Sequence, residues 1–266
     1  MKRFATLLLL VFWAFSGAVQ GQLLTRDVDP QQLIDDARKT VNEMARHPDY
    51  EVLLDDLRTA KGVLIFPRVI RGGFFVGGSG GLGVFMAWDE ARGDYSPVAF
   101  YSLGSVSLGV QFGGEVAEVV IVARTQNAVD SLFATAFRLG GDASVAAGPV
   151  GAGRSATVAA DFLSYARSQG AYVGMSLEGS RLRIRDDFNE AYYGEKLRPV
   201  HIIEGRRVDN PGTHALRADL AGFRQAPAAP ARPEEAAPDV MPPQGFEPAE
   251  PGSGGLTIEE LDAENI

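Results

Sequence analysis

Residues 105–112 alternate strictly between apolar and small or polar side chains, the pattern of a β-strand with one buried side. Val106, Leu108, Val110 and Phe112 occupy every second position, and serine, glycine and glutamine fill the others. In a strand this pattern places all the apolar side chains on one side, whereas in a helix it would scatter them around the axis. Strand signatures, alternating or continuously apolar, recur at residues 62–67, 118–125, 156–160, 171–177 and 181–185.

Helical patterns stand before these strands and at their edges. Residues 30–47 repeat apolar positions at helical spacing, after a capping aspartate and a proline at the first helical position. Residues 49–61 predict a second, shorter helix, residues 126–137 an inserted helix and residues 186–194 a closing helical turn. Because strand follows strand rather than helix, the sequence predicts an α+β fold. We expect a mainly antiparallel β-sheet or barrel-like core with N-terminal helices and one or two inserted helices.

Residues 1–21 have the features of a signal peptide. Two basic residues precede an apolar run at residues 4–15, and small residues then offer cleavage after Ala18 or Gly21. The competing interpretation is an uncleaved anchor, but the run falls short of the roughly 20 residues that a spanning helix needs. The sequence therefore predicts an exported bacterial protein, periplasmic or extracellular, with possible peripheral attachment to an envelope membrane.

Residues 221–266 differ in composition from the rest of the chain. They hold 9 acidic residues against 2 arginines, and 8 of the 15 prolines. This composition predicts a disordered tail, because it offers too little apolar surface to offset chain entropy. Residues 256–266 (LTIEELDAENI) alone have the pattern of a short amphipathic helix for a protein partner; the alternative is a solvating tail without a partner. Residues 22–220 are left as the folded domain.

Charge and composition exclude several classes of function. The chain has 34 acidic and 25 basic residues, a net charge of −9 at pH 7, so nucleic acid is not an expected partner. It has no cysteine, which excludes disulfides, thiolate catalysis and cysteine-based zinc sites. Its three histidines lie far apart in the sequence. We therefore expect no metal and no cofactor.

The glycine-rich residues 72–85 (GGFFVGGSGGLGVF) contain two motifs of enzymes. Residues 78–83 spell the dinucleotide fingerprint G-x-G-x-x-G, and residues 77–81 spell the nucleophile elbow G-x-S-x-G. Both motifs require a helix to begin at the turn, whereas the residues after Gly83 continue as strand. Glycines among aromatic strand residues instead indicate bulges, curvature or close backbone approach. We expect an architectural role for them, and no catalytic residue.

Six stretches in order resemble the SYLF domain family, a lipid-binding family of bacteria and eukaryotes. The resemblance covers about residues 50–194, and the one noted departure is Tyr95, which stands before Ser96-Pro97 where relatives usually carry tryptophan. The stretches are AKGVLIFP (residues 60–67), GGFFVGGSGGLGVF, SLGVQFGGE (107–115), DASVAAGPVG (142–151), LSYARSQGAYVGMSLEGS (163–180) and NEAYYG (189–194).

The resemblance implies association with phospholipid. Eukaryotic members that carry SH3 or FYVE modules bind phosphoinositides and, in some cases, actin, and we expect neither module nor those ligands here. The leading hypothesis is a non-enzymatic domain that binds anionic phospholipid or a membrane surface. The alternative is a structural or scaffolding envelope protein that recruits a protein partner through its acidic C-terminal tail.

The first candidate group for membrane contact is Arg38, Lys39 and Arg46 on the predicted helix 30–47. The resemblance implicates this element, because an amphipathic N-terminal helix contacts membranes in eukaryotic relatives. Three acidic residues share the helix, however, and a mixed polar side is typical of a solvated helix packed on a core. A membrane-surface helix normally carries more basic residues and more apolar bulk.

The second group is Arg181, Arg183 and Arg185. Alternation predicts that all three lie on one side of one strand, with successive side chains about 7 Å apart. Such close like charges need anions. These are either acidic residues, such as Glu178, Asp186 or a cross-strand acid, or phosphate headgroups, which suit the guanidinium fork.

The third group is Lys61, Arg68 and Arg71, at the two ends of the strand that closes at Pro67. Lys61 has an alternative role at the C-terminus of the second helix, where a cation is favourable. Trp88 is expected to pack in the core or at a strand end rather than to anchor at a membrane.

Overall fold

The computed structural model describes residues 28–73, 76–108, 113–148, 160–168, 171–172 and 177–226, all within one compact unit, Met1–Ala228. The predicted signal peptide and residues 227–266 lie outside the described residues. So do the predicted strand positions 156–159 and 173–176, and the last two apolar positions of the alternating stretch, Val110 and Phe112.

Two helices precede the sheet, as the sequence predicts. Helix α2 (Pro30–Arg46) begins at Asp29, whose side chain accepts a hydrogen bond from the backbone N–H of Gln31. The short 3-10 helix η1 (Pro48–Tyr50) then turns the chain into α3 (Glu51–Thr59). The apolar positions of α2 are all buried, so this helix packs as a core element.

The strands form one mainly antiparallel sheet, which confirms the predicted α+β class. In spatial order it runs β6-β10-β4-β2-β1-β5-β8-β7, with β3 beside β2 and β9 beside β8, and of the named pairings only β7 with β8 is parallel. The strands are β1 (Gly62–Gly73), β2 (Val76–Asp89), β3 (Asp94–Tyr95), β4 (Ala99–Leu108), β5 (Gly113–Ala123), β6 (Ala136–Arg138), β7 (Val145–Ala147), β8 (Phe162–Ser168), β9 (Ala171–Tyr172) and β10 (Arg181–Ile184).

The sheet curls into a half-barrel with a buried inner face. Phe137 of β6 and Phe162 of β8 stand near opposite ends of the strand order, yet their ring centroids are 5.6 Å apart. Leu182 of β10 and Ile121 of β5 belong to the same inner core. The inner face is therefore filled by the sheet itself, together with α4 (Gln126–Ser131) and α6 (Pro199–Ile203).

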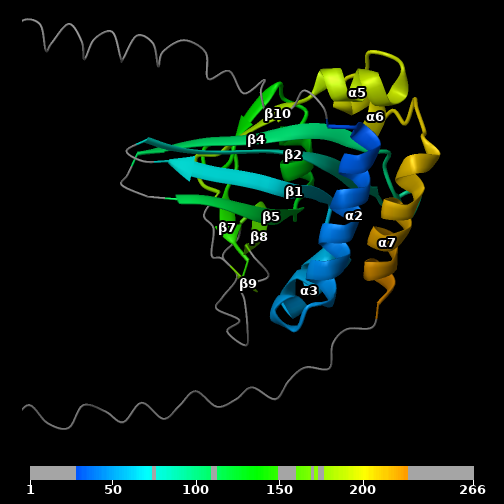
Figure 1. Ribbon diagram of the computed structural model, residues 1–266. Helices are drawn as coiled ribbons and strands as arrows, with labels where there is room; N and C mark the ends of the chain where they lie inside the picture. Colours follow the sequence, from blue (N-terminus) through cyan, green and yellow to red (C-terminus); the bar gives the residue numbers. More distant parts are fainter. Residues whose placement is uncertain are drawn as a thin grey trace, which may run out of the picture. The chain divides into compact units, whose positions relative to one another are not determined.

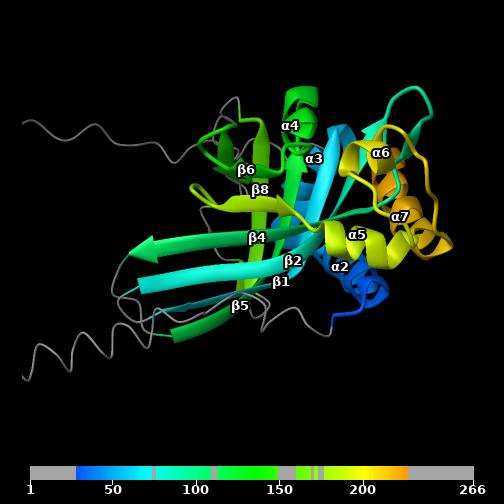
Figure 2. The ribbon, with the colours of Figure 1, turned by 90° about the horizontal axis from the view of Figure 1, so that it is seen from above.

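The outer face of the sheet carries a second core under helices. Val84 of β2 and Val120 of β5 pack there against apolar residues of α2, α3 and α7 (His214–Gln225). Figures 1 and 2 show these helices over one end of the long strands β1, β2, β4 and β5, whose other ends run on beyond them. Among the described residues, helices therefore cover the outer face at one end of these strands and not at the other.

The C-terminal helices correct one predicted boundary. Helix α7 follows the 3-10 helix η2 (Pro211–Thr213) and continues past Leu220, the predicted end of the domain. Phe223 packs on the outer core, and the guanidinium of Arg224 lies 4.0 Å from the ring centroid of Trp88. Trp88 thus packs at a strand end, as expected. The low apolar content of residues 221–266 as a whole masks this last helical turn.

Two further predictions are wrong in detail. The inserted helix ends at Ser131 rather than at residue 137, because Phe137 turns inward on a short edge strand, β6, paired with β10. Strand β10 ends at Ile184, and Arg185 is already the N-cap residue of α5 (Asp186–Tyr193), the predicted closing helix. Periodicity fails at both places because the element changes within one period of the pattern.

The glycine-rich tract is part of a strand, as predicted, and no helix opens in it. A Cβ atom on Gly83 would lie 2.5 Å from the carbonyl oxygen of Ile65 and would overlap the ring of Phe66. Gly81 is equally close to the carbonyl oxygen of Arg68, next to a bulge between β1 and β2. These glycines allow close backbone approach on the inner face.

Candidate functional site

The part of the outer face that no described helix covers is the candidate site, and strand register defines which residues lie on it. Directly opposed residues of neighbouring strands project to the same side of a sheet. Leu82, which is part of the outer core, pairs with Ser102 of β4, and Ser102 pairs with Arg183 of β10. Arg183 therefore lies on the outer face, and Arg181, two residues away, lies there too.

Two more arginines lie on the same face, one on the neighbouring strand β6 and one on β1, three strands away. Arg138 of β6 stands directly opposite Arg181, and Arg68 of β1 stands opposite Leu82. All four side chains are exposed, and none forms an ion pair with any residue in the described part of the chain. We call Arg68, Arg138, Arg181 and Arg183 the arginine face.

Glu118, a carboxylate on this side of the sheet, is already bound. Glu118 of β5 accepts hydrogen bonds from Arg167 Nε at 2.6 Å and from Thr40 Oγ1 at 2.9 Å. Arg167 also reaches Glu43 of α2 at 2.7 Å. Glu118 therefore pairs with Arg167 rather than with the arginine face.

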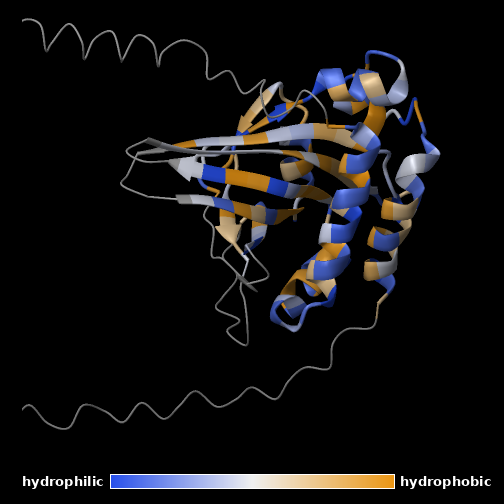
Figure 3. Cartoon of the chain, viewed as in Figure 1, coloured by the Kyte–Doolittle hydropathy of each residue, from blue (hydrophilic) through white to orange (hydrophobic). Residues whose placement is uncertain are grey.

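Exposed valines and glycines share this part of the outer face. Val106 of β4 is 81% exposed and Val116 of β5 is 43% exposed. Gly80 of β2 and Gly104 of β4 lie between Arg181 and Val116 in the strand order. Along β1, Figure 3 shows hydrophilic and hydrophobic bands, and residues 68–71 of this strand read Arg-Val-Ile-Arg.

The structure divides the predicted group Arg181, Arg183 and Arg185. Arg185 leaves the strand and binds Asp187, with Nη2 2.6 Å from Oδ2, while its guanidinium carbon lies 4.5 Å from the ring centroid of Phe188. The hydrogen bond from Arg185 lowers the pKa of Asp187. Arg185 therefore has a structural role, because it binds Asp187, which lies two residues after it in the sequence.

The predicted group on α2 lies beside an open polar pocket of about 490 Å³, which includes Arg38, Lys39 and Arg46 in its lining. Arg38 Nε donates to Asp219 of α7 at 2.6 Å, and this hydrogen bond raises the pKa of Arg38. Lys39 is exposed and Arg46 donates to Asn42 at 3.3 Å. Arg38 of this group thus links α2 to α7 through an acidic residue. The apolar side of α2 faces the core.

The third predicted group is split between two sides of the sheet. Lys61 pairs with Glu90 at 2.5 Å, instead of closing a helix, and Arg71 lies 3.9 Å from Glu115. Arg68 alone has no acidic partner in the described residues and belongs to the arginine face.

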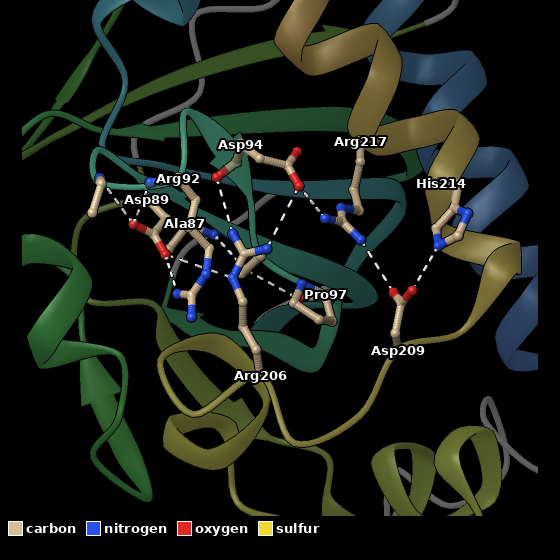
Figure 4. Close-up of polar contacts among 11 residues, drawn as sticks. Ala87, Asp89, Arg92, Asp94, Pro97, Arg206, Asp209, His214 and Arg217 are labelled. Atoms are coloured by element: carbon tan, nitrogen blue, oxygen red, sulfur yellow. Dashed lines mark hydrogen bonds and ion pairs between the residues drawn. The ribbon is translucent and has the colours of Figure 1, made fainter.

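A second arginine cluster lies between the β2–β3 hairpin and α7, and each of its arginines forms an ion pair (Figure 4). Arg217 of α7 binds Asp94 of β3 and lies 3.1 Å from Asp209, which His214 Nε2 also contacts at 2.8 Å. Arg206 lies 3.5 Å from Asp94. Arg92 reaches Asp89 at 2.6 Å, and Arg206 lies 3.7 Å from the same carboxylate. We call these residues the paired cluster.

Sequence reasoning missed Arg138. The sequence predicts a helix over residues 126–137, so Arg138 is expected just after a helix and not on a strand. The available signal was the sequence Ala136-Phe137-Arg138, in which one apolar residue stands between two that turn out to be exposed. Three residues are too few to show a period.

The described residues offer no arrangement for catalysis at the glycine tract. The hydroxyl oxygen of Ser79 is 2.7 Å from that of Ser105 on the neighbouring strand, and β2 continues to Asp89. No group of three His, Asp or Glu residues in the described ranges could hold a metal ion. No helix in the same ranges is long and apolar enough to cross a membrane.

Comparison with known proteins gives one matching family and several relatives. The family described as "Ysc84: Las17-binding protein actin regulator" matches residues 104–222. LAS seventeen-binding protein 3 of Saccharomyces cerevisiae is 34% identical over 170 residues, covering 61% of this chain and 36% of that protein. SH3 domain-containing YSC84-like protein 1 of Homo sapiens is 33% identical over 164 residues, covering 59% and 47%.

An SH3 domain-containing protein of Schizosaccharomyces pombe is 31% identical over 193 residues, covering 70% of this chain and 42% of that protein. The chain thus spans less than half of the length of these relatives. The matched family region runs from β4 to α7 and contains Arg138, Arg181 and Arg183. This part of the chain is therefore similar to the Ysc84/SYLF family.

Proposed function

We propose that the domain is a non-enzymatic module that binds anionic phospholipid surfaces through the arginine face. One observation carries the proposal: four exposed guanidinium groups share one side of the sheet, and the described residues provide them with no acidic partner. Unpaired like charges at neighbouring strand positions repel each other. A phosphate-bearing surface relieves this repulsion and offers the bidentate geometry that guanidinium groups favour.

The architecture disfavours the rival route, insertion of the N-terminal helix. Leu33, Val41 and Met44 are among the apolar residues of α2 that are buried against the sheet. Inserting this side into a membrane would require the helix to leave the core. The basic residues of α2 also share their pocket with Asp35 and Asp219, which reduces the attraction to anions.

A pair of matched triple variants tests the proposal. Arg138, Arg181 and Arg183 are changed to glutamine in one protein, and Arg38, Lys39 and Arg46 in the other, so both lose three positive charges. Binding is measured by co-sedimentation with vesicles of phosphatidylglycerol and phosphatidylcholine at low salt. Because each basic residue near such a surface contributes on the order of 1 kcal/mol, the first variant should bind at least tenfold more weakly.

The second variant should keep most of its affinity. Equal losses in both would mean that only net charge matters, and a loss confined to the second would move the site to α2. Thermal melts serve as the control for folding, since removing unpaired exposed arginines should not lower the melting temperature.

Location forms a separate part of the proposal. The basic and apolar pattern of residues 1–21 supports export, which would bring the arginine face to an envelope membrane. Mass spectrometry of the protein isolated from its own cells tests this. A mature N-terminus at residue 19 or 22 is expected, and an intact residue 1–15 segment would contradict it.

A further inference from the structure

The arginine face has an apolar side, formed by Val106 and Val116. In the described residues, the large apolar side chains that remain exposed are these two and Val28. Both valines project from the outer face, because Val106 pairs with Gly78 and Val116 pairs with Ile70. Other valines of the sheet, such as Val63, Val84 and Val120, are buried.

Strand register places the charged and apolar residues in one line. Arg181 pairs with Gly104, which pairs with Gly80 on β2. Gly80 pairs with Ile70, and Ile70 pairs with Val116. From β10 to β5 this line crosses four strand spacings, about 19 Å in all. Arg181 stands at one end of this line, Gly104 and Gly80 follow it, and Ile70 and Val116 form the other end.

The glycines in the middle of this line are not required for packing. A Cβ atom on Gly80 would come no closer than 3.8 Å to another residue, and one on Gly104 no closer than 3.9 Å. The nearest atoms are backbone oxygens in both cases. Gly81 and Gly83, by contrast, could not carry a Cβ atom without displacing their neighbours. The outer glycines thus leave a low strip of sheet between Arg181 and Val116, with Val106 beside this strip on β4.

We propose that this surface docks on a lipid bilayer with Val106 and Val116 inserted at the boundary between headgroups and acyl chains. The inference rests on the proposed function and specifies how the same site binds. A bilayer presents phosphate and hydrocarbon within one shallow layer, and arginine side chains bend toward the phosphates while neighbouring apolar groups go deeper. A purely electrostatic surface would have no use for two exposed valines.

Environment-sensitive labels test the insertion directly. The sequence has no cysteine, so Val106→Cys, Val116→Cys and the control Lys39→Cys each carry a single NBD label. Lys39 lies on α2 and its side chain is 72% exposed. With phosphatidylglycerol–phosphatidylcholine vesicles, the labels at 106 and 116 should shift to the blue and be quenched by bromine atoms near the top of the acyl chains. The label at 39 should do neither.

The same samples separate this inference from the proposed function. Labelled protein that sediments with vesicles, but shows no shift or quenching at 106 and 116, would overturn the insertion and leave lipid binding intact. Quenching at 39 instead would also overturn it, in favour of docking through α2. If unlabelled wild-type protein does not sediment with anionic vesicles, the proposed function itself fails, and the insertion with it.

An isosteric variant supplies a second measurement. Changing Val106 and Val116 together to threonine keeps the branched shape that suits a strand but removes the apolar character. At 0.5 M salt, where the attraction of the arginines is screened, binding to vesicles should fall about tenfold relative to wild type. Equal binding of the two proteins at this salt concentration would contradict an apolar contribution.

Discussion

The two arginine clusters of this domain use the same side chain in opposite ways. In the paired cluster, Arg92, Arg206 and Arg217 meet Asp89, Asp94 and Asp209 within ion-pair distance. On the arginine face, the described residues offer no carboxylate to any of the four guanidinium groups. The first arrangement stabilises the chain itself, and the second leaves charge available for something outside it.

The difference follows from where each cluster lies in the fold. The paired cluster joins the hairpin of β2 and β3 to the helix α7. Packing of these elements removes water from the charged groups, which contact each other instead. Arg217 and Arg206 are each only 14% exposed, and a buried guanidinium without a partner would be costly. The arginine face lies on an open sheet, where solvent or a ligand satisfies each group.

The largest expected effect is on the paired cluster. Arg217→Gln would leave Asp94 and Asp209 with weaker partners, and loss of one member of a partly buried ion-pair network should cost about 3 kcal/mol. For a domain of this size the melting temperature should fall by about 6–12 °C. Vesicle binding of the folded protein should not change. A normal melt would show that the network is dispensable and weaken the contrast between the clusters.

The next largest effect is the difference in stability between alanine substitutions on the two sides of the glycine tract. Gly83→Ala forces a Cβ atom against Phe66 and the carbonyl oxygen of Ile65, so we expect a loss of about 2 kcal/mol in urea unfolding. Gly80→Ala, on the arginine face, should change stability by less than about 0.5 kcal/mol. Equal losses in the two variants would mean that the outer glycines are structural as well.

Acid should weaken the paired cluster but leave the cations of the arginine face charged. The hydrogen bond with His214 lowers the pKa of Asp209, and the hydrogen bond from Arg92 lowers that of Asp89. A lowered carboxyl pKa stabilises the fold above the unfolded value, near 4, and this contribution is lost as pH falls through the folded value.

Asp209→Asn should therefore cost about 1 kcal/mol or less at pH 7, given its exposure, and make unfolding less sensitive to pH below about 4. Urea titrations at pH 7, 5, 4 and 3 measure both quantities. If the variant loses stability in acid as wild type does, Asp209 does not contribute to the acid sensitivity of the paired cluster.

The smallest effect comes from giving the arginine face an acid of its own. Ala136 is exposed and stands opposite Arg183. Ala136→Glu should add about 0.5 kcal/mol of stability through a cross-strand ion pair and weaken binding to phosphatidylglycerol vesicles about fivefold, the equivalent of about 1 kcal/mol. Ala136→Gln is the control for shape. If both variants bind alike, Arg183 has no part in the site.

Periodicity in the sequence was sufficient for the long elements and for part of the site. The alternation of Arg181 and Arg183 with Leu182 correctly placed two arginines together on one side of a strand. It failed for Arg185, because a helix begins there and the side chain turns to Asp187. It also failed for Arg138, because a strand of three residues carries no readable period.

Sequence alone determined the α+β class, the buried side of each long element and the strand nature of the glycine tract. These depend on local periodicity and on the requirement that apolar side chains be buried. Only the tertiary structure decided which cations have partners. Asp94 and Arg217 lie far apart in the sequence, as do Arg138 and Arg181, yet each pair meets in the fold. Pairing of charge is a property of strand order and helix packing, and local sequence does not record it.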